Sequence, residues 1–276
     1  MEKQRDDNNL IEVNLIENPA HLSPEEASRI TEDFIGLSWR ACGGKDWRNY
    51  DTGRSAWTRF YQADGNRPRD FDFIITVYKG LQLIYMTCFQ LVKLTPSTTA
   101  IWCHLGMTDP QYQGTGNIAR TFKEEHLAGT LAFFDKVEGQ RFLVARTPNP
   151  IVYEVMRRMT KPFMPAGQFF PDIDPSAHIR PIPQRIRELA VRISEKLSSN
   201  CYFDPESFVL KGYFKEFGSL YHDYDFPCRN DAVTKYFEEH LDRSNMDGIM
   251  IIVDFGDSPD RNATVNLRGK QDISKT

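Results

Sequence analysis

The sequence lacks the features that mark secreted and membrane-spanning proteins. Its five cysteines are scattered along the chain without a Cys-x-x-Cys pair, and their odd number argues against a disulfide framework. The N-terminus is polar and acidic where a signal peptide would be basic and then apolar. No stretch approaches the roughly 18 uncharged apolar residues of a transmembrane helix. We therefore expect a cytoplasmic protein with reduced thiols and no membrane span.

An excess of basic residues is also missing. The formal net charge is −4 over 276 residues, whereas a general nucleic-acid binder usually carries a basic patch. We therefore expect no nucleic-acid partner, although an anionic ligand could still bind at a local site. Hydrophobic residues make up 40% and charged residues 26% of the chain, which is the composition of a soluble globular protein that can bury a proper core.

The residue pattern divides the chain into four segments: a flexible arm over 1–22, a core over 23–160, a C-terminal elaboration over 161–255 and a polar tail over 256–276. Ser23-Pro24-Glu25-Glu26 supplies an N-cap, a proline at the first helical position and early acids. This pattern predicts a helix from there to about Trp39. A short helix is expected near residues 55–60.

The rest of the chain alternates between strand and helix patterns. Alternating apolar residues predict three strands over 71–77, 81–94 and 99–107. A turn-forming stretch follows, and the pattern then predicts, in order, a helix, a strand at 141–146, a helix at 150–158, a proline-rich loop at 162–183, a helix at 184–197, a strand at 208–214, a helix at 231–241 and a strand at 248–255. This order predicts an α/β protein with a mixed β-sheet flanked by helices, to which the C-terminal elaboration adds strands.

Gln113-Gly114-Thr115-Gly116 carries the clearest chemical signal. Two glycines one residue apart let the backbone turn tightly, so that several N–H groups point inward. The helix that begins at once adds its own unpaired N–H groups and the positive end of its dipole, which suits a phosphate or diphosphate. The loop is neither a Walker A motif, since no Gly-Lys-Ser/Thr follows, nor a dinucleotide fingerprint, since the third glycine is missing. A Gly-x-Gly before a helix is, on its own, more often a plain strand-to-helix turn.

The wider segment Asp109-Pro-Gln-Tyr-Gln-Gly-Thr-Gly116, after a strand and before a long helix, resembles the coenzyme A loop of the GNAT superfamily of acyltransferases. In that family the loop amides bind the CoA diphosphate. Arg146-Thr-Pro-Asn149 resembles the family's next element, in which an Asn at the helix start contacts the pantetheine or phosphate arm. The resemblance covers roughly residues 70–160. It implies a GNAT-like fold and acyl-CoA or CoA as co-substrate, with no metal.

The resemblance also implies a set of donor-binding residues on the strand, the loop and the next helix start: Leu105, Met107, Thr108, Gln113, Gly114, Thr115, Gly116, Asn117, Ile118 and Asn149. Two positions depart from the family pattern. Asn117 stands as an insertion between the second glycine and the usual small residue. Met156 stands seven residues after Asn149, where the family often has a catalytic tyrosine.

His104 is the candidate general base. Strand alternation places Trp102, His104 and Gly106 on one face and Cys103 on the other. Histidine titrates near neutrality, and some relatives that this chain resembles use a His or Glu at about this place, often through water. An equally favoured interpretation is a core histidine bonded to a neighbour. A bulge at residues 106–108 would reverse the facing of the side chains after it.

The other candidate side chains are interpreted mainly as structural. Tyr153 could protonate the leaving thiolate in place of the absent tyrosine, but it lies one turn too early and packing is favoured. Cys103 faces away from His104, so a buried inert thiol is expected. Three further groups are read as a solvated helix face, as turn formers and as a surface loop that would also suit an amine acceptor: Glu124-Glu-His126, Asp172 with Asp174, and Tyr221–Asp225.

Together these patterns predict an N-acyltransferase that moves an acyl group from acyl-CoA, or from the phosphopantetheine arm of an acyl carrier protein, to an amine of a small molecule or peptide. The alternative is a non-catalytic GNAT-like module that binds a thioester or nucleotide and acts as a sensor or partner protein. The absence of the family's tyrosine at Met156 keeps this alternative open.

Overall fold

A computed structural model of the chain describes residues 11–42, 50–112, 129, 132–133, 136–161, 168–198, 200–215 and 228–255. The chain divides into two compact units. The first takes in the described parts of 1–91, 102–133 and 214–225, and the second takes in those of 92–101, 134–213 and 226–276.

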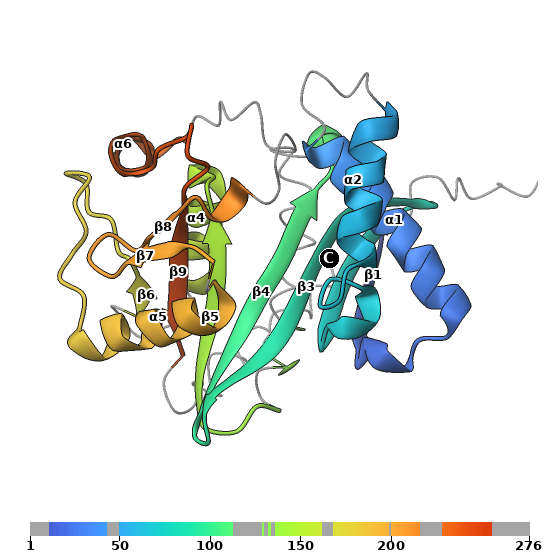
Figure 1. Ribbon diagram of the computed structural model, residues 1–276, viewed down its shortest axis with the longest axis horizontal. Helices are drawn as coiled ribbons and strands as arrows, with labels where there is room; N and C mark the ends of the chain where they lie inside the picture. Colours follow the sequence, from blue (N-terminus) through green and yellow to red (C-terminus); the bar gives the residue numbers. More distant parts are fainter. Residues whose placement is uncertain are drawn as a thin grey trace, which may run out of the picture. The chain divides into compact units, whose positions relative to one another are not determined.

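The first unit pairs four strands with two helices (Figure 1). Its strands follow the order β1-β2-β3-β4, and β2 pairs antiparallel with both β1 and β3. The long strands β3 and β4 each continue into the second unit. The elements are β1 (Ile11–Glu17), α1 (Pro24–Cys42), α2 (Tyr50–Gln62), β2 (Phe73–Lys79), β3 (Gln82–Thr95) and β4 (Thr98–Thr108), with short 3-10 helices at Pro19–His21, Pro68–Asp70 and Pro110–Tyr112.

Helix α1 begins where the sequence predicts. The Ser23 hydroxyl accepts from the Glu26 backbone N–H at 3.2 Å, and the Glu26 carboxylate accepts from the Ser23 N–H at 2.8 Å. This reciprocal capping box satisfies two of the N–H groups that every helix start leaves unpaired. The acceptor role of its carboxylate lowers the pKa of Glu26.

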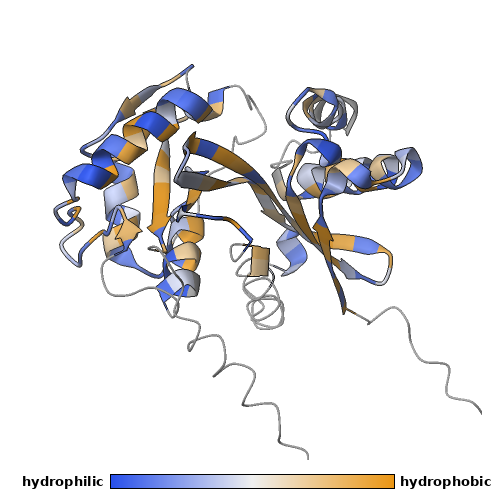
Figure 2. Cartoon of the chain, turned by 90° about the horizontal axis from the view of Figure 1, so that it is seen from below, coloured by the Kyte–Doolittle hydropathy of each residue, from blue (hydrophilic) through white to orange (hydrophobic). Residues whose placement is uncertain are grey.

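Helices α1 and α2 cover one face of these strands through a shared apolar core. Phe34 of α1 and Tyr61 of α2 lie with ring centroids 5.6 Å apart, and the Tyr61 hydroxyl is 2.7 Å from that of Ser38. We call this core the α1–α2 cluster, and its buried members are Ile30, Phe34, Ile35, Leu37, Trp57, Tyr61, Phe71, Ile74, Leu83, Met86, Cys88, Leu105 and Met107. In Figure 2 the helices are banded in blue and orange, whereas several strands are orange along most of their length, as expected where a helix buries one stripe and a strand is covered more fully.

The second unit is built around β9, whose seven residues are all buried. Strands follow the order β5-β9-β8-β7, and β6 also pairs with β9. Strand β9 is antiparallel to β5, β6 and β8, and β8 is antiparallel to β7. The Gln140 N–H donates to the Ser97 carbonyl at 2.9 Å, which ties the start of β5 to the β3–β4 turn. The elements are β5 (Gln140–Thr147), α4 (Pro150–Thr160), β6 (Phe169–Phe170), α5 (Gln184–Leu197), β7 (Tyr202–Asp204), β8 (Val209–Lys211), α6 (Asp231–His240) and β9 (Gly248–Asp254).

Asp247 fixes the turn that enters β9. The residue is 2% exposed, and its carboxylate accepts from Lys211 Nζ at 2.9 Å, from the Gly212 N–H at 2.8 Å and from Asn245 Nδ2 at 2.7 Å. Burial acts to raise the pKa of Asp247, but these donors and the Asp242 N–H outweigh it and hold the pKa below its ordinary value. The charged carboxylate therefore stabilises the folded state.

The predicted fold class is confirmed: the chain is an α/β protein in which helices flank the strands, and its C-terminal part adds strands. One boundary was wrong. Residues 11–17 belong to β1 and pair with β2, instead of forming part of a loose arm over 1–22. The reason is the alternation in Ile-Glu-Val-Asn-Leu-Ile-Glu, which suits a half-covered strand. The two units also divide the chain differently from the predicted boundary at residue 160.

The C-terminal strands are shorter than the sequence pattern predicts. The strand expected over 208–214 is the three-residue β8, and β7 and β6 are two further short strands that were not predicted. Strands of two or three residues form because a neighbour pairs with them, so local pattern alone does not reveal them. Within the described part of the chain, no helix combines the length and the apolar character needed to cross a membrane.

Candidate functional site

The predicted donor loop, residues 113–118, lies outside the described residues. The segment before it belongs to the first unit: β4 ends at Thr108 and a single 3-10 turn spans Pro110–Tyr112. The predicted residue Asn149 belongs to the second unit, where β5 ends at Thr147 and α4 begins at Pro150. Each segment is described by itself.

Asp109 holds the end of β4 immediately before the loop. Its side chain is 1% exposed and pairs with Arg40 of α1, whose Nε lies 2.6 Å from Oδ2. Gln82 Nε2 donates to the same oxygen at 3.1 Å, and the Gln111 N–H donates to Oδ1 at 3.1 Å. The Asp109 N–H in turn donates to the Ile84 carbonyl at 2.9 Å. This carboxylate therefore ties the strand end to α1, to β3 and to the first turn of the following segment.

The facing of side chains along β4 is not a simple alternation. Thr87 of β3 points away from the α1–α2 cluster, since the residues on either side of it belong to that cluster. Cys103 Sγ lies 3.4 Å from the Thr87 hydroxyl, and a Cβ at Gly106 would lie 3.6 Å from it, so both face the Thr87 side. His104 contacts cluster rings and Leu105 is a cluster member.

Two consecutive residues, His104 and Leu105, thus lie on the cluster side, which is what one extra residue in a strand produces. The predicted opposition of Cys103 and His104 is confirmed. The prediction that Gly106 shares the face of His104 was wrong, because alternation breaks between His104 and Leu105, earlier than the considered bulge at 106–108.

His104 sits in a ring of aromatic side chains. Its Nε2 lies 2.8 Å from Oδ1 of Asn66. Its ring centroid is 4.4 Å from Trp102 in an edge-on contact, 5.4 Å from Phe71 and 6.4 Å from Phe60. With the Asn66 oxygen as acceptor, Nε2 carries the proton, and Nδ1 is the nitrogen that a neutral ring would use as a base. The bonded neighbour is what the structural interpretation of His104 requires. Nδ1 itself is buried, and the role of His104 as base stays a prediction.

Tyr153 is surrounded by the second unit. The side chain is fully buried, its hydroxyl donates to the Pro171 carbonyl at 2.6 Å, and the Ile173 N–H donates to it at 3.2 Å. The rings of Phe169 and Phe237 pack edge-on against it. Burial raises the pKa of Tyr153 well above its ordinary value. To protonate a thiolate, this hydroxyl would have to give up its hydrogen bond to a buried carbonyl, which costs free energy. The packing interpretation is therefore favoured.

Asn149 is the N-cap of α4. Its Oδ1 accepts from the Ile151 N–H at 2.8 Å, and its own N–H donates to the Thr147 hydroxyl at 3.0 Å. The oxygen of the side-chain amide is thus committed to the helix start. The amide nitrogen is the group through which Asn149 would contact a donor.

The remaining predicted donor residues differ in what they can offer. Leu105 and Met107 bury their side chains in the α1–α2 cluster, so only their backbone groups could face a ligand. Thr108 is half-buried at the strand end. The residues Gln113, Gly114, Thr115, Gly116, Asn117 and Ile118 lie outside the described residues.

The groups interpreted as structural fit that interpretation where the structure describes them. Asp174 Oδ1 accepts from the N–H groups of Ser176 and His178, and Asp172 pairs with Arg180 at 3.3 Å. Both acids therefore serve turns. Among the described residues no group of three or more His, Cys, Asp or Glu side chains could hold a metal ion. Residues 124–126 and 221–225 lie outside them.

Sequence reasoning missed Arg40, Asp109 and Asn66. Asp109 carried a signal, since an Asp before Pro at the end of a strand commonly caps the turn that follows. Arg40 and Asn66 carried none, because each meets its partner across a long stretch of chain.

No protein-family model matches the sequence, and no curated protein matches it. Among solved structures, the chain is similar to an aminoglycoside N-acetyltransferase in complex with CoA, at 13% identity and a TM-score of 0.32 over 54% of this chain and 86% of that one. It is similar to an acyl-CoA N-acyltransferase from Pseudomonas aeruginosa, at 12% identity and a TM-score of 0.32 over 49% of this chain and 80% of that one. It is also similar to an integron cassette protein from the mobile metagenome of V. cholerae, at 13% identity and a TM-score of 0.34 over 65% of this chain and 97% of that one. Similarity at this level establishes neither a shared activity nor a shared substrate.

Proposed function

We propose that the chain is an N-acyltransferase that transfers an acyl group from acyl-CoA to an amine. The observation that carries the proposal is the segment from Asp109 to Gly116, whose residues and spacing resemble a CoA-binding loop. Its placement supports the proposal: the segment follows directly on strand β4, and Asp109 is held by an ion pair and two further hydrogen bonds.

The proposed reaction needs few side chains. The amine nitrogen bonds to the thioester carbonyl carbon and the carbon–sulfur bond breaks. CoA leaves as its thiolate, which takes up a proton. Backbone N–H groups of Gln113 to Gly116 would hold the diphosphate, and the Asn149 amide would contact the pantetheine arm. His104 would accept the proton that the amine loses. Positioning of the two substrates supplies much of the remaining rate.

A non-catalytic donor-binding module is the second candidate. Met156 replaces the family's tyrosine, and the nearest tyrosine, Tyr153, has both a donor and an acceptor partner in a buried site. In this case the chain would bind the acyl donor but would not transfer its acyl group to an amine. The carrier-protein version of the enzyme shares the same pantetheine chemistry and stays part of the first proposal.

Two measurements separate these candidates. CoA and acetyl-CoA should raise the melting temperature by mass action, and free CoA thiol should appear only when a suitable amine is added. Gly114→Val and Gly116→Val should abolish the thermal shift while leaving the unliganded melting temperature nearly unchanged. Donor binding without thiol release across a broad amine panel would favour the module.

A flat thermal titration up to millimolar CoA would move the test to an acyl carrier protein loaded with the same acyl group. Absence of transfer from that donor as well would overturn the proposal. Unchanged CoA binding in both glycine variants would show that the loop is only a turn.

A further inference from the structure

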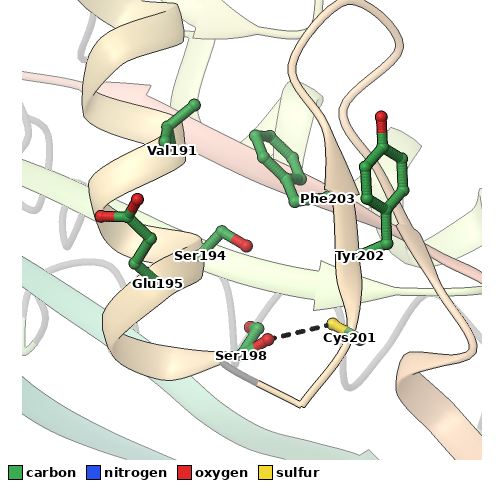
Figure 3. A pocket seen from close by; sticks show the side chains of 7 residues that line it. All are labelled: Val191, Ser194, Glu195, Ser198, Cys201, Tyr202 and Phe203. Carbon is green, nitrogen blue, oxygen red and sulfur yellow. Dashed lines mark hydrogen bonds between the residues drawn. The ribbon is translucent and has the colours of Figure 1, made fainter.

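The second unit carries a pocket that the proposed function does not use. It lies between the last two turns of α5 and strand β7, with a volume of about 320 Å³ (Figure 3). That volume is at the lower end for small-molecule sites. We call it the α5–β7 pocket, and its lining residues are Val191, Ser194, Glu195, Ser198, Cys201, Tyr202 and Phe203.

Ser194 points to a ligand. The residue is 5% exposed, and among the described residues its hydroxyl has no hydrogen-bond partner. In Figure 3 the hydroxyl points from α5 into the space between the helix and β7. Because it faces the pocket, this hydroxyl is available to a polar group placed there.

The charges at the pocket favour a cation. Glu195 is the only ionised side chain among the lining residues, and the C-terminal end of a helix carries partial negative charge. One of two neighbouring cations, Arg146, is bonded to Ser198 of the lining, and the other, Lys196, is bonded outside the pocket. Arg146 donates to the Leu197 carbonyl at 2.8 Å and to the Ser198 hydroxyl at 2.6 Å and stacks on a tyrosine ring, while Lys196 donates to the carbonyl of Lys93.

The Phe203 ring forms the opposite wall (Figure 3). Phe203 and Tyr202 line the pocket from β7, the last strand in the order of the second unit. Tyr202 is 69% exposed, so a ligand in the pocket would cover apolar surface that is now in water. Aromatic faces beside a carboxylate are the surroundings in which organic ammonium ions bind.

We propose that the α5–β7 pocket binds a small organic ammonium ion with an aryl or short alkyl body. The ammonium group would contact the Glu195 carboxylate and the Ser194 hydroxyl, and the body would lie against Phe203 and Val191, with Tyr202 at the edge of the pocket. The proposal stands apart from the acyltransferase function, since none of these residues belongs to the donor loop or to its flanks.

The test uses the full chain and phenethylamine, which is protonated at pH 7, with 2-phenylethanol as its neutral counterpart. Calorimetric or NMR titration should give saturable binding of the amine at least about fivefold tighter than that of the alcohol. Glu195→Gln should raise the dissociation constant about three- to fivefold, and Ser194→Ala about as much. Glu188→Gln makes the same charge change on the same helix away from the pocket, and it should leave the affinity unchanged.

Cys201 supplies an independent readout. Its thiol donates to the Ser198 carbonyl at 3.3 Å at the edge of the pocket, so bound amine should slow its alkylation by iodoacetamide, measured by peptide mass, and leave Cys103 alkylation unaffected. Equal affinity for amine and alcohol, equal effects of Glu195→Gln and Glu188→Gln, or no saturable binding up to millimolar amine would overturn the proposal. None of these outcomes bears on CoA binding, so this proposal and the acyltransferase proposal fail separately.

Discussion

Replacing Arg40 by methionine tests whether the Asp109 ion pair holds the end of β4. Methionine keeps much of the length and apolar stem of arginine but removes the charge, so a carboxylate that is 1% exposed loses its cation. Breaking a buried pair by removing one partner costs about 3–5 kcal/mol. Gln82 and the Gln111 N–H still donate to Asp109, and Arg40 is itself 31% exposed, so water can replace part of its contact.

These offsets reduce the expected loss to about 2–3 kcal/mol, because screening by solvent weakens a partly exposed pair. For a chain of this size the melting temperature should then fall by about 4–10 °C. The matched control is Arg54→Met, which removes an exposed pair with Glu32 from α2 of the same unit and should cost at most about 1 kcal/mol.

The assay is thermal unfolding followed by circular dichroism, with CoA binding measured on the same samples at a temperature where both variants are folded. Because Asp109 lies four residues before Gln113, Arg40→Met should also weaken CoA binding, whereas Arg54→Met should not. A loss of stability in Arg40→Met no larger than in Arg54→Met would refute the reasoning. A double-mutant cycle with Asp109→Asn would isolate the coupling of the pair.

Four further outcomes are expected. The depressed pKa of Asp247 contributes stability that is present above its unfolded value of about 3.9 and is lost as pH falls through the folded value. The melting temperature should therefore drop on acidification below about pH 4, and Asp247→Asn should be less stable at pH 7 with a flatter acid limb. Gly139→Ala should destabilise by more than about 2 kcal/mol in urea unfolding, because φ is +83° and the new Cβ would lie 2.4 Å from the Ser97 carbonyl oxygen. Gly65→Ala, at φ +84° with open space around it, should cost only about 1 kcal/mol. Asn149→Ala should cost about 1 kcal/mol through loss of the cap, while Asn149→Ser should restore stability. CoA affinity that falls in both Asn149 variants would indicate that the side-chain amide contacts the donor. Unchanged affinity in both would show that it does not. His104→Ala and His104→Gln should lower turnover by roughly 10²- to 10⁴-fold with little change in CoA affinity, and full activity in either would retire His104 as base.

The elements predicted best from sequence are those whose pattern is long and whose ends are marked. The helix predicted over 184–197 has the same bounds in the structure, and Ser23 with Glu26 forms the expected cap of α1. The elements missed are those that depend on a neighbour. Strand β6 consists of two residues beside β9, and a pair of residues has no periodicity to read.

The same distinction explains the candidate site. The glycine-rich loop can be read from sequence because its signal is local. The facing of Gly106 relative to His104 cannot, since alternation along β4 breaks between His104 and Leu105, and the break shows only through contacts with Thr87 and Phe71. A single extra residue in a strand reverses every later assignment. A residue role inferred from alternation therefore holds only up to the first bulge.

The buried carboxylates show where sequence reasoning loses most. The chain has 38 acidic residues, and hydropathy assigns all of them to the surface, yet within the described ranges four are at most 5% exposed: Asp109, Glu154, Asp247 and Asp254. Each has an arginine or lysine partner within 3.0 Å. Three of the four lie at the beginning or end of a strand, and two of those accept from backbone N–H groups of the adjoining turns. A carboxylate can leave water at such a place because it satisfies N–H groups that the turn would otherwise leave unpaired, and a cation offsets its charge. An acid next to a strand end that has a turn-forming neighbour, as Asp109 has Pro110, is thus a better candidate for burial than its hydropathy indicates.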